Sequence, residues 1–201
     1  MSLLRNGAFK KLGPNAFEHA LFYKHQDAIR FELSAEGSYI DMFIEALSKA
    51  ELIINDVFSA SNDLQVCVSS YYSDSPFELR AVLRELKMCE ISIPCERDYW
   101  VSADPESDRS YRVFVIFSIS KSDIRKIIWG AVAMDLGIKP SIRGSVYIYS
   151  LTNGVLAHPY DDRGMDIIGD TAILSELYRK YNAFLLEYDR EAMDASFGKT
   201  S

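Results

Sequence analysis

The stretch that decides the fold is VYIYSLTNGVLAH, residues 146–158. Two runs rich in aliphatic and aromatic residues, Val146–Tyr149 and Val155–His158, flank the pair Asn153-Gly154. An Asn-Gly pair between two such runs is typical of a β-hairpin, because both residues tolerate the left-handed backbone conformation of a tight turn. We therefore expect an antiparallel hairpin whose tip is Asn153-Gly154, with both residues left-handed.

Further strands are expected before the hairpin. Ile29–Leu33 alternates apolar and charged residues, which places Arg30 and Glu32 on one face of a strand. Segments 64–70, 91–94 and 111–118 are also strand candidates, and the last is rich in β-branched and aromatic residues. The Pro, Asp and Ser content of residues 102–110 predicts an internal surface loop.

Helices alternate with these strands. Apolar residues follow the helical period between Ile40 and Phe58. Amphipathic segments also follow capping signals at Ser75, Ser120 and Asp170, and Asp189 can start a short terminal helix. Helices interrupted by adjacent strands predict an α+β fold, with a mainly antiparallel sheet packed with four or five helices.

The chain length fits one domain. With 201 residues, 48% of them hydrophobic, the chain can bury a core without a disulfide or a metal. We expect residues 1–201 to form a single domain with one shared core, which contains Ile29, Phe31, Leu33, Phe43, Leu47, Ile54, Leu83, Phe114, Ile116, Ile127, Ile128, Ile148, Leu174 and Leu177.

Charge and composition exclude several classes of function. The 29 acidic and 22 basic residues give a net charge of −7, which disfavours nucleic acid as a partner. No apolar run approaches the length of a membrane span, and the N-terminus lacks the apolar core of a signal peptide, so we expect a cytoplasmic protein that does not contact membranes. The spacing of the cysteines and histidines does not match a metal site. The sequence also contains no phosphate-binding loop motif, so nothing in it indicates a nucleotide cofactor. We expect no cofactor, and we interpret His158 as a lone surface or partly packed histidine.

The most polar short segment follows the predicted hairpin. Asp161, Asp162, Arg163 and Asp166 surround Gly164 where the second strand should end. Carboxylates beside an arginine can position a water, hold an anion or bind a metal. The competing interpretation is a structural turn, in which an aspartate accepts backbone N–H bonds, Arg163 pairs with a carboxylate and Gly164 adopts a conformation closed to other residues. We favour the structural turn.

Arg30 and Glu32 form a second candidate group. If a helix covers their face of the strand, each charge needs a partner, and Asp162 or Arg163 could complete a buried network with them. If the face is open, the two residues are an ordinary solvated pair. The sequence does not decide between these arrangements.

Four motifs taken together resemble one known family. They are Leu21-Phe22-Tyr23, Ile29–Leu33, Tyr160–Ile168 (YDDRGMDII) and Leu177–Asn182 (LYRKYN), in that order. The chain is similar to the bacterial domain-of-unknown-function family numbered 3885 from about Leu21 to Phe197, including a closing Tyr188-Asp189-Arg190. Phe184 stands where tryptophan is expected. The family has no established activity, and the resemblance implies only that Asp161, Asp162, Arg163, Gly164 and Asp166 match its motif.

Two classes of function remain open. Small size, acidic charge and many tyrosines favour a protein-interaction module, such as an immunity-type protein that neutralises a toxin. The alternative is a hydrolase or small-ligand enzyme that uses the segment 161–166, with Arg163 holding an anionic group. A concave pocket containing Arg30, Glu32, Asp162 and Arg163 would favour the enzyme, whereas internal pairing of these charges would favour binding.

Overall fold

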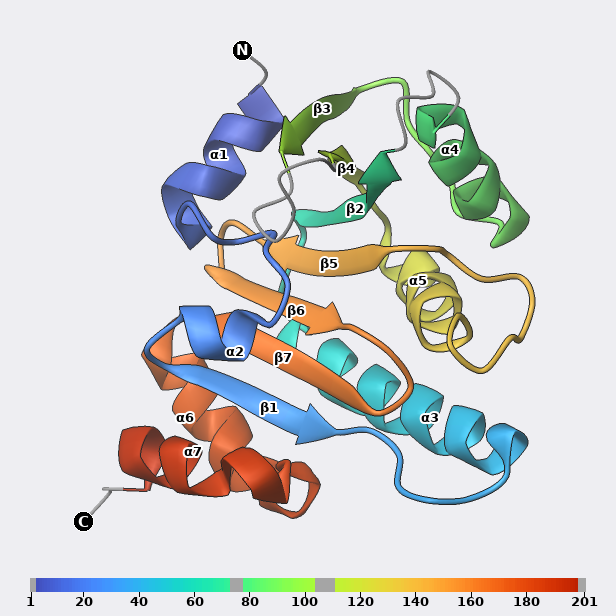
Figure 1. The fold of residues 1–201 in the computed structure, drawn as a ribbon. Helices are drawn as coiled ribbons and strands as arrows, with labels where there is room; N and C mark the ends of the chain where they lie inside the picture. Colours follow the sequence, from blue (N-terminus) through green and yellow to red (C-terminus); the bar gives the residue numbers. More distant parts are fainter. Residues whose placement is uncertain (1–2, 73–77, 104–110, 199–201) are drawn as a thin grey trace.

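The computed structural model describes residues 3–72, 78–103 and 111–198. In these residues one seven-stranded sheet has the order β1-β7-β6-β5-β2-β4-β3, and every neighbouring pair of strands is antiparallel (Figure 1). The strands are β1 (Ala28–Glu32), β2 (Leu64–Tyr72), β3 (Arg97–Ala103), β4 (Tyr111–Ser118), β5 (Ser145–Ser150), β6 (Val155–Pro159) and β7 (Gly164–Gly169).

Seven α-helices within the described ranges accompany the sheet and confirm the α+β class. They are α1 (Leu3–Leu12), α2 (Leu21–Lys24), α3 (Tyr39–Val57), α4 (Glu78–Met88), α5 (Ile124–Val132), α6 (Thr171–Lys180) and α7 (Arg190–Phe197). The predicted helices correspond to α3–α7, and the predicted cap at Ser75 lies outside the described residues. The two N-terminal helices were not predicted, since α2 has only four residues and α1 carries little amphipathic pattern.

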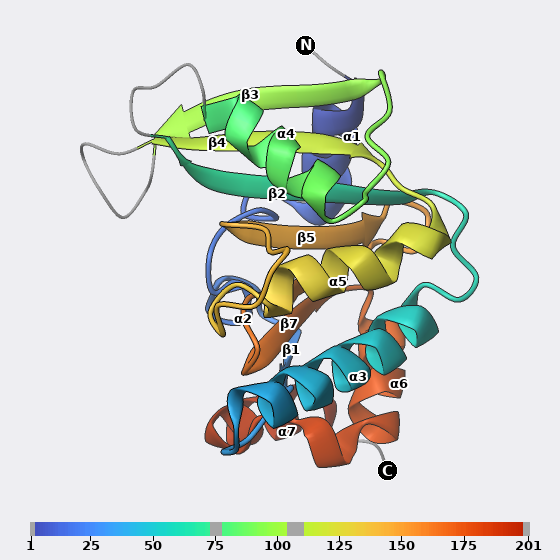
Figure 2. The ribbon, with the colours of Figure 1, turned by 90° about the vertical axis from the view of Figure 1, so that its right-hand side faces the viewer.

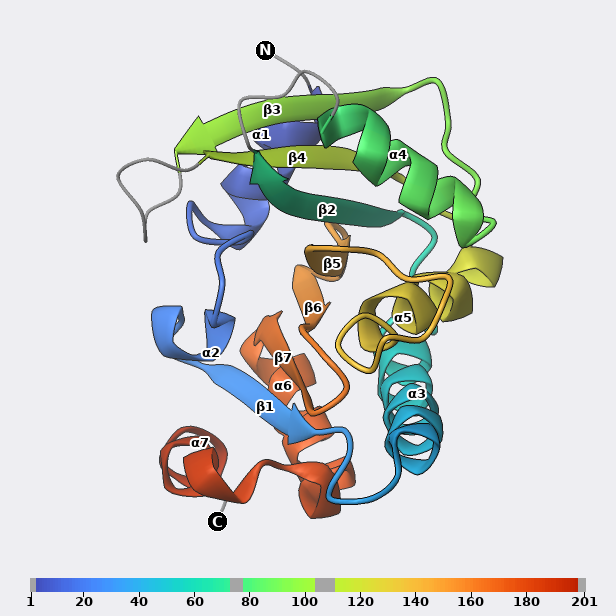
Figure 3. The ribbon, with the colours of Figure 1, turned by 45° about the vertical axis from the view of Figure 1, so that its right-hand side comes forward.

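The sheet has two covered faces and therefore two hydrophobic clusters. The larger cluster lies between the sheet and helices α3–α7, and the smaller one lies beneath α1, α2 and the segment that joins them (Figures 2 and 3). The prediction of one shared core was wrong for Phe114 and Ile116, which belong to the smaller cluster. They alternate along β4 with Val113, Val115 and Phe117, and alternate residues of a strand face opposite sides of the sheet.

The hairpin of β5 and β6 is confirmed, but its turn differs from the prediction. The last paired residues are Ser150 and Val155, so four residues form the turn instead of two. Gly154 is left-handed (φ 65°) and its N–H donates to the Ser150 carbonyl at 2.9 Å, whereas Asn153 has no positive φ. The Asn153 side chain instead donates to the Ser61 hydroxyl at 2.7 Å, which ties the turn to the segment after α3.

Two strand boundaries also differ. Segment 91–94 is not a strand; it includes Pro94, which has no N–H for a ladder, and the pairing with β4 begins only at Arg97. Ser102 and Ala103, predicted as loop, belong to β3, and residues 104–110 lie outside the described residues.

The edge formed by β1 is covered by the C-terminal part of the chain. Phe31 bridges to Leu185, and the Leu186 N–H donates to the Arg30 carbonyl at 3.0 Å. The Arg30 N–H donates to the Met193 sulfur at 3.3 Å. Segment 182–197 therefore holds the first strand from outside, beside the polar motif. No helix in the described parts of the chain is long and apolar enough to cross a membrane.

Candidate functional site

The β6–β7 turn contains the most distinctive motif of the sequence. Asp161 accepts backbone N–H bonds from Arg163 (2.8 Å) and Gly164 (3.1 Å) through Oδ1. Its Oδ2 accepts from the Arg163 guanidinium at 2.6 Å and 3.0 Å. The Asp161 side chain is 6% exposed, whereas that of Arg163 is 72% exposed. Asp161 is thus the buried centre of a hydrogen-bonded turn, as the structural interpretation of the motif expects.

Gly164 is required for space, not for an unusual conformation. Its φ is not positive, so the expectation of a special backbone conformation was wrong. A Cβ at this position would collide with the Tyr160 hydroxyl and would lie 3.1 Å from the Phe31 carbonyl oxygen. The glycine therefore lets the Tyr160 ring lie against the first residue of β7.

Asp162 joins the same turn to the end of β1. Its carbonyl accepts a hydrogen bond from the Ser34 hydroxyl at 2.9 Å, and its carboxylate lies 3.4 Å from the same hydroxyl. The Leu33 N–H donates to the Arg163 carbonyl at 2.8 Å, which continues the pairing of β1 beyond its last residue. Burial raises the pKa of Asp162, and the neighbouring charge of Asp161 adds to this shift.

Arg30 takes part in a buried ion-pair network, but not with the partners considered for it. Its Nε and Nη2 donate to Asp166 at 2.7 Å and 3.0 Å, because Arg30 and Asp166 are directly opposite in the β1–β7 ladder. Its Nη1 donates to Asp189 at 3.1 Å. Asp162, Arg163 and Glu32 do not take part in these bonds. The structure thus brings Arg30 and Asp166 together and separates them from the other candidates.

The surroundings of this network leave it no free face. The Asp166 side chain is fully buried and also accepts the Phe22 N–H at 3.1 Å. The rings of Phe22, Tyr23 and Tyr160 lie 5.0, 4.7 and 5.6 Å from the Arg30 guanidinium. Burial lowers the pKa of Arg30, but the bonds and charge of Asp166 outweigh it and raise the pKa above its ordinary value. This closed pair anchors the N-terminal segment onto the sheet.

His158 lies beside Asp166 and was misjudged from the sequence. It is opposite Asp166 in the β6–β7 ladder and fully buried, not at the surface. Its Nδ1–H donates to the Val146 carbonyl at 2.8 Å, and its ring stacks on Tyr147 at 4.3 Å. Burial lowers the pKa of His158 to about 4. Strand alternation from Leu156 was the signal that places this histidine on an inner face.

An open cleft of about 740 Å³ lies beside the turn, where β1 ends. Of the predicted residues, Glu32 and Arg163 line it, whereas Arg30, Asp161, Asp162 and Asp166 do not. The remaining wall comes from loop 34–37, Met42, Tyr160 and Leu186. Sequence reasoning missed Glu36, a second exposed carboxylate of this wall, because nothing in its local pattern distinguishes it from a solvated loop residue.

The electrostatics of the cleft are acidic. The Arg163 guanidinium is paired with Asp161, so it contributes little free positive charge. Among the described residues, neither the Glu32 nor the Glu36 carboxylate has a hydrogen-bond or ion-pair partner. Met42, Leu186 and the Tyr160 ring supply apolar surface between these charges. The cleft can therefore hold a segment that carries both positive charge and apolar groups.

No group of three or more histidine, cysteine, aspartate or glutamate side chains within the described ranges is arranged to hold a metal ion. The cysteines are free thiols, with Cys67 and Cys89 buried and Cys95 exposed. Burial raises the pKa of Cys89 to about 11, so its thiol stays protonated near neutral pH.

The fold and the site together define an α+β protein with a seven-stranded antiparallel sheet, whose distinctive motif closes an internal ion-pair network beside an acidic cleft. The family model described as "Domain of unknown function (DUF3885)" matches residues 6–189, and the chain belongs to this family. The match begins within α1, before the Leu21 at which the resemblance was expected to begin, and it ends at Asp189, before its expected end at Phe197. Comparisons with curated proteins and with solved structures gave no match.

Proposed function

We propose that this protein is a protein-interaction module that binds a basic segment of a partner protein in the cleft at the end of β1. The observation that supports this proposal is the distribution of charge around the β6–β7 turn. Arg30, Asp161, Arg163 and Asp166 are paired with one another or with Asp189, whereas the Glu32 and Glu36 carboxylates of the cleft are not paired among the described residues. The paired charges stabilise the fold, whereas the unpaired carboxylates are available to bind a partner.

Apolar surface beside the cleft supports the same proposal. Tyr39 and Ile40, at the start of α3 and close after the cleft loop, are 70% and 67% exposed. Exposed aromatic and aliphatic side chains next to charge are typical of protein interfaces. An immunity-type role would be one instance of this function, in which the basic partner is a toxin.

The alternative is a hydrolase or small-ligand enzyme, and one observation favours it. The raised pKa of Asp162 is a property that a general acid needs. Asp162, however, does not line the cleft, and its carbonyl and carboxylate are both directed to Ser34. We therefore prefer the interaction module.

The test is affinity capture from a lysate of the source organism. The bait is the full chain, either unchanged or with Glu32→Lys and Glu36→Lys together. A matched control carries Glu176→Lys and Glu191→Lys, two exposed positions on α6 and α7 with the same change in charge. We expect a stoichiometric basic protein on the unchanged and control baits, released by salt and lost from the cleft variant. A partner that the cleft variant retains, or the absence of any stoichiometric partner, contradicts the proposal.

A further inference from the structure

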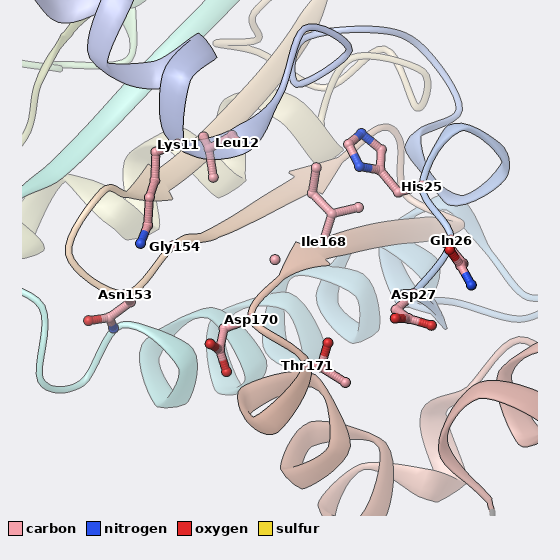
Figure 4. A pocket seen from close by; sticks show the side chains of 11 residues that line it. Lys11, Leu12, His25, Gln26, Asp27, Asn153, Gly154, Ile168, Asp170 and Thr171 are labelled. Carbon is pink, nitrogen blue, oxygen red and sulfur yellow. The ribbon is translucent and has the colours of Figure 1, made fainter.

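A second hollow lies at the opposite end of β1, far from the acidic cleft in the sheet. This pocket has a volume of about 370 Å³ and is walled by five parts of the chain: the end of α1, segment 25–27, the β5–β6 turn, the end of β7 and the start of α6 (Figure 4). Its size is at the lower end of the range of small-molecule sites, and its lining is mainly polar.

Three polar side chains of this pocket have no partner among the described residues. In the part of the chain that the structure describes, no hydrogen bond or ion pair involves the Lys11 ammonium, the Asp27 carboxylate or the Thr171 hydroxyl. The His25 Nε2 atom is buried and also lacks a partner. Lys11 and Thr171 are exposed and Asp27 is half-buried, so these three groups are accessible to a ligand that enters the hollow.

The positively and negatively charged side chains lie on different walls of the pocket. Lys11 reaches down from α1 over the β5–β6 turn, and Asp27 and Thr171 lie across the pocket from it (Figure 4). Gly154 makes this approach possible, since a Cβ there would lie 2.8 Å from the Lys11 side chain. Asp170 adds a second carboxylate: its Oδ1 caps α6 by accepting from Ala172 (3.0 Å), while its other oxygen is unused.

We propose that this pocket binds a small zwitterion of the α-amino-acid class. A simple anion is disfavoured by the two carboxylates, and a simple cation is disfavoured by the lysine, because like charges at short range repel. A molecule that carries both charges satisfies both walls: its carboxylate meets Lys11, and its ammonium meets Asp27 and the Thr171 hydroxyl. This site is independent of the protein-binding cleft and does not rest on the proposed function.

The test is calorimetric titration of the full chain with the standard α-amino acids, each up to about 10 mM. We expect at least one of them to bind, and we expect its amide and its N-acetyl derivative, which each lack one charge, to bind at least about tenfold more weakly. No binding by any of the amino acids overturns the proposal. Equal binding of the amide or of the N-acetyl derivative overturns it as well.

Two variants locate the site. Lys11→Ala and Asp27→Asn should each weaken binding about tenfold or more, because each removes one charge-assisted contact. The matched controls are Lys10→Ala, which is exposed on the same helix, and Glu176→Gln, which is exposed on α6, and neither lines the pocket. The controls should bind as the unchanged chain does, and thermal melts confirm that all four variants are folded. Binding that Lys11→Ala and Asp27→Asn leave unchanged would place the ligand elsewhere and refute the assignment.

Discussion

At the scale of single residues, the turn motif separates into members with different roles. Asp161 is buried and accepts two backbone N–H bonds, whereas Arg163 extends from the turn with a largely exposed side chain. An exposed partner in an ion pair contributes little to stability, since solvent screens the pair. The hydrogen bonds that Asp161 makes to the backbone are the stabilising part of the motif.

This difference gives the first prediction. Asp161→Ala should lower the free energy of unfolding by about 1–3 kcal/mol, because it leaves the N–H groups of Arg163 and Gly164 without their acceptor. Arg163→Ala should lower it by less than about 1 kcal/mol. Urea denaturation of both variants measures the two effects. An Arg163 variant that is the less stable of the two would show that the exposed pair, not the turn, holds this motif.

The second prediction concerns pH and His158. The pKa of this histidine is about 4 in the folded protein, because burial disfavours its charged form, and about 6.5 in the unfolded chain. Between these values the unfolded chain binds a proton that the folded protein does not bind. The contribution of His158 to stability is therefore complete above about pH 6.5 and decreases as the pH falls, by about 3 kcal/mol at pH 4.

The measurement is the free energy of unfolding from pH 7 to pH 4. His158→Asn removes the titrating ring while its amide can still donate to the Val146 carbonyl, so this part of the pH dependence should disappear. His19→Asn, at an exposed position, serves as the control and should keep the slope of the unchanged protein. Equal slopes in all three proteins would rule out the buried histidine as the acid-sensitive group.

At the residue scale, the sequence predicted hydrogen bonds within the turn better than ion-pair partners that are distant in the chain. The hydrogen bonds of Asp161 follow from short-range turn chemistry, so the structural interpretation of 161–164 could be stated in advance. The partners of Arg30 could not, because Asp166 and Asp189 are set by strand register and by the return of the C-terminal segment to β1. Long-range contacts of this kind leave no local pattern.

At the scale of elements, a predicted capping residue can be checked by whether its side chain accepts a backbone N–H at the start of the helix. Asp170 accepts from the Ala172 and Ile173 N–H groups at the start of α6. Ser120, in contrast, makes no cap bond to a backbone N–H: its hydroxyl donates to the Asp123 carboxylate at 2.8 Å, and a short 3₁₀ turn over Lys121–Asp123 precedes α5. Segment 91–94 shows the limit of pattern reading, since a short apolar run becomes a strand only if another strand is available to pair with it.

The third prediction tests the β5–β6 turn. Gly154→Val should lower the melting temperature by several degrees, because a β-branched residue is strained at φ 65° and its Cβ would also meet the Lys11 side chain. Gly154→Asn is the matched control, since asparagine tolerates the left-handed region, and it should cost less. Thermal melts of both variants decide the point. A melting temperature unchanged by valine would mean that the turn conformation is not required.

At the scale of the whole molecule, the strand order is the feature that sequence patterns could not supply. Pattern reading identified an antiparallel α+β protein, but not that β1 lies beside β7 or that β2 lies between β4 and β5. Each pairing joins segments distant in the chain, and the registers depend on residues of both strands. The two-sided core has the same origin, since it exists only because segment 3–27 returns to cover the second face.

The last prediction follows from this interleaved order. Strands β1, β2 and β3 precede residue 104, and β4–β7 follow residue 110, yet in the sheet the two sets alternate as β1, then β7-β6-β5, then β2, β4 and β3. A chain cut at a protease site inserted between 103 and 111 should remain one complex that melts in a single transition. The N-terminal half contains no pair of neighbouring strands, since β1 pairs with β7, β2 pairs with β4 and β5, and β3 pairs with β4. The C-terminal half keeps β5, β6 and β7 together but loses the partners of β4 and the outer neighbours of β5 and β7. Each half, expressed alone, should therefore lack a cooperative melt, because its strands would expose unpaired N–H and C=O groups together with apolar faces. Two halves that separate in native buffer and melt independently would contradict the expectation of a single domain.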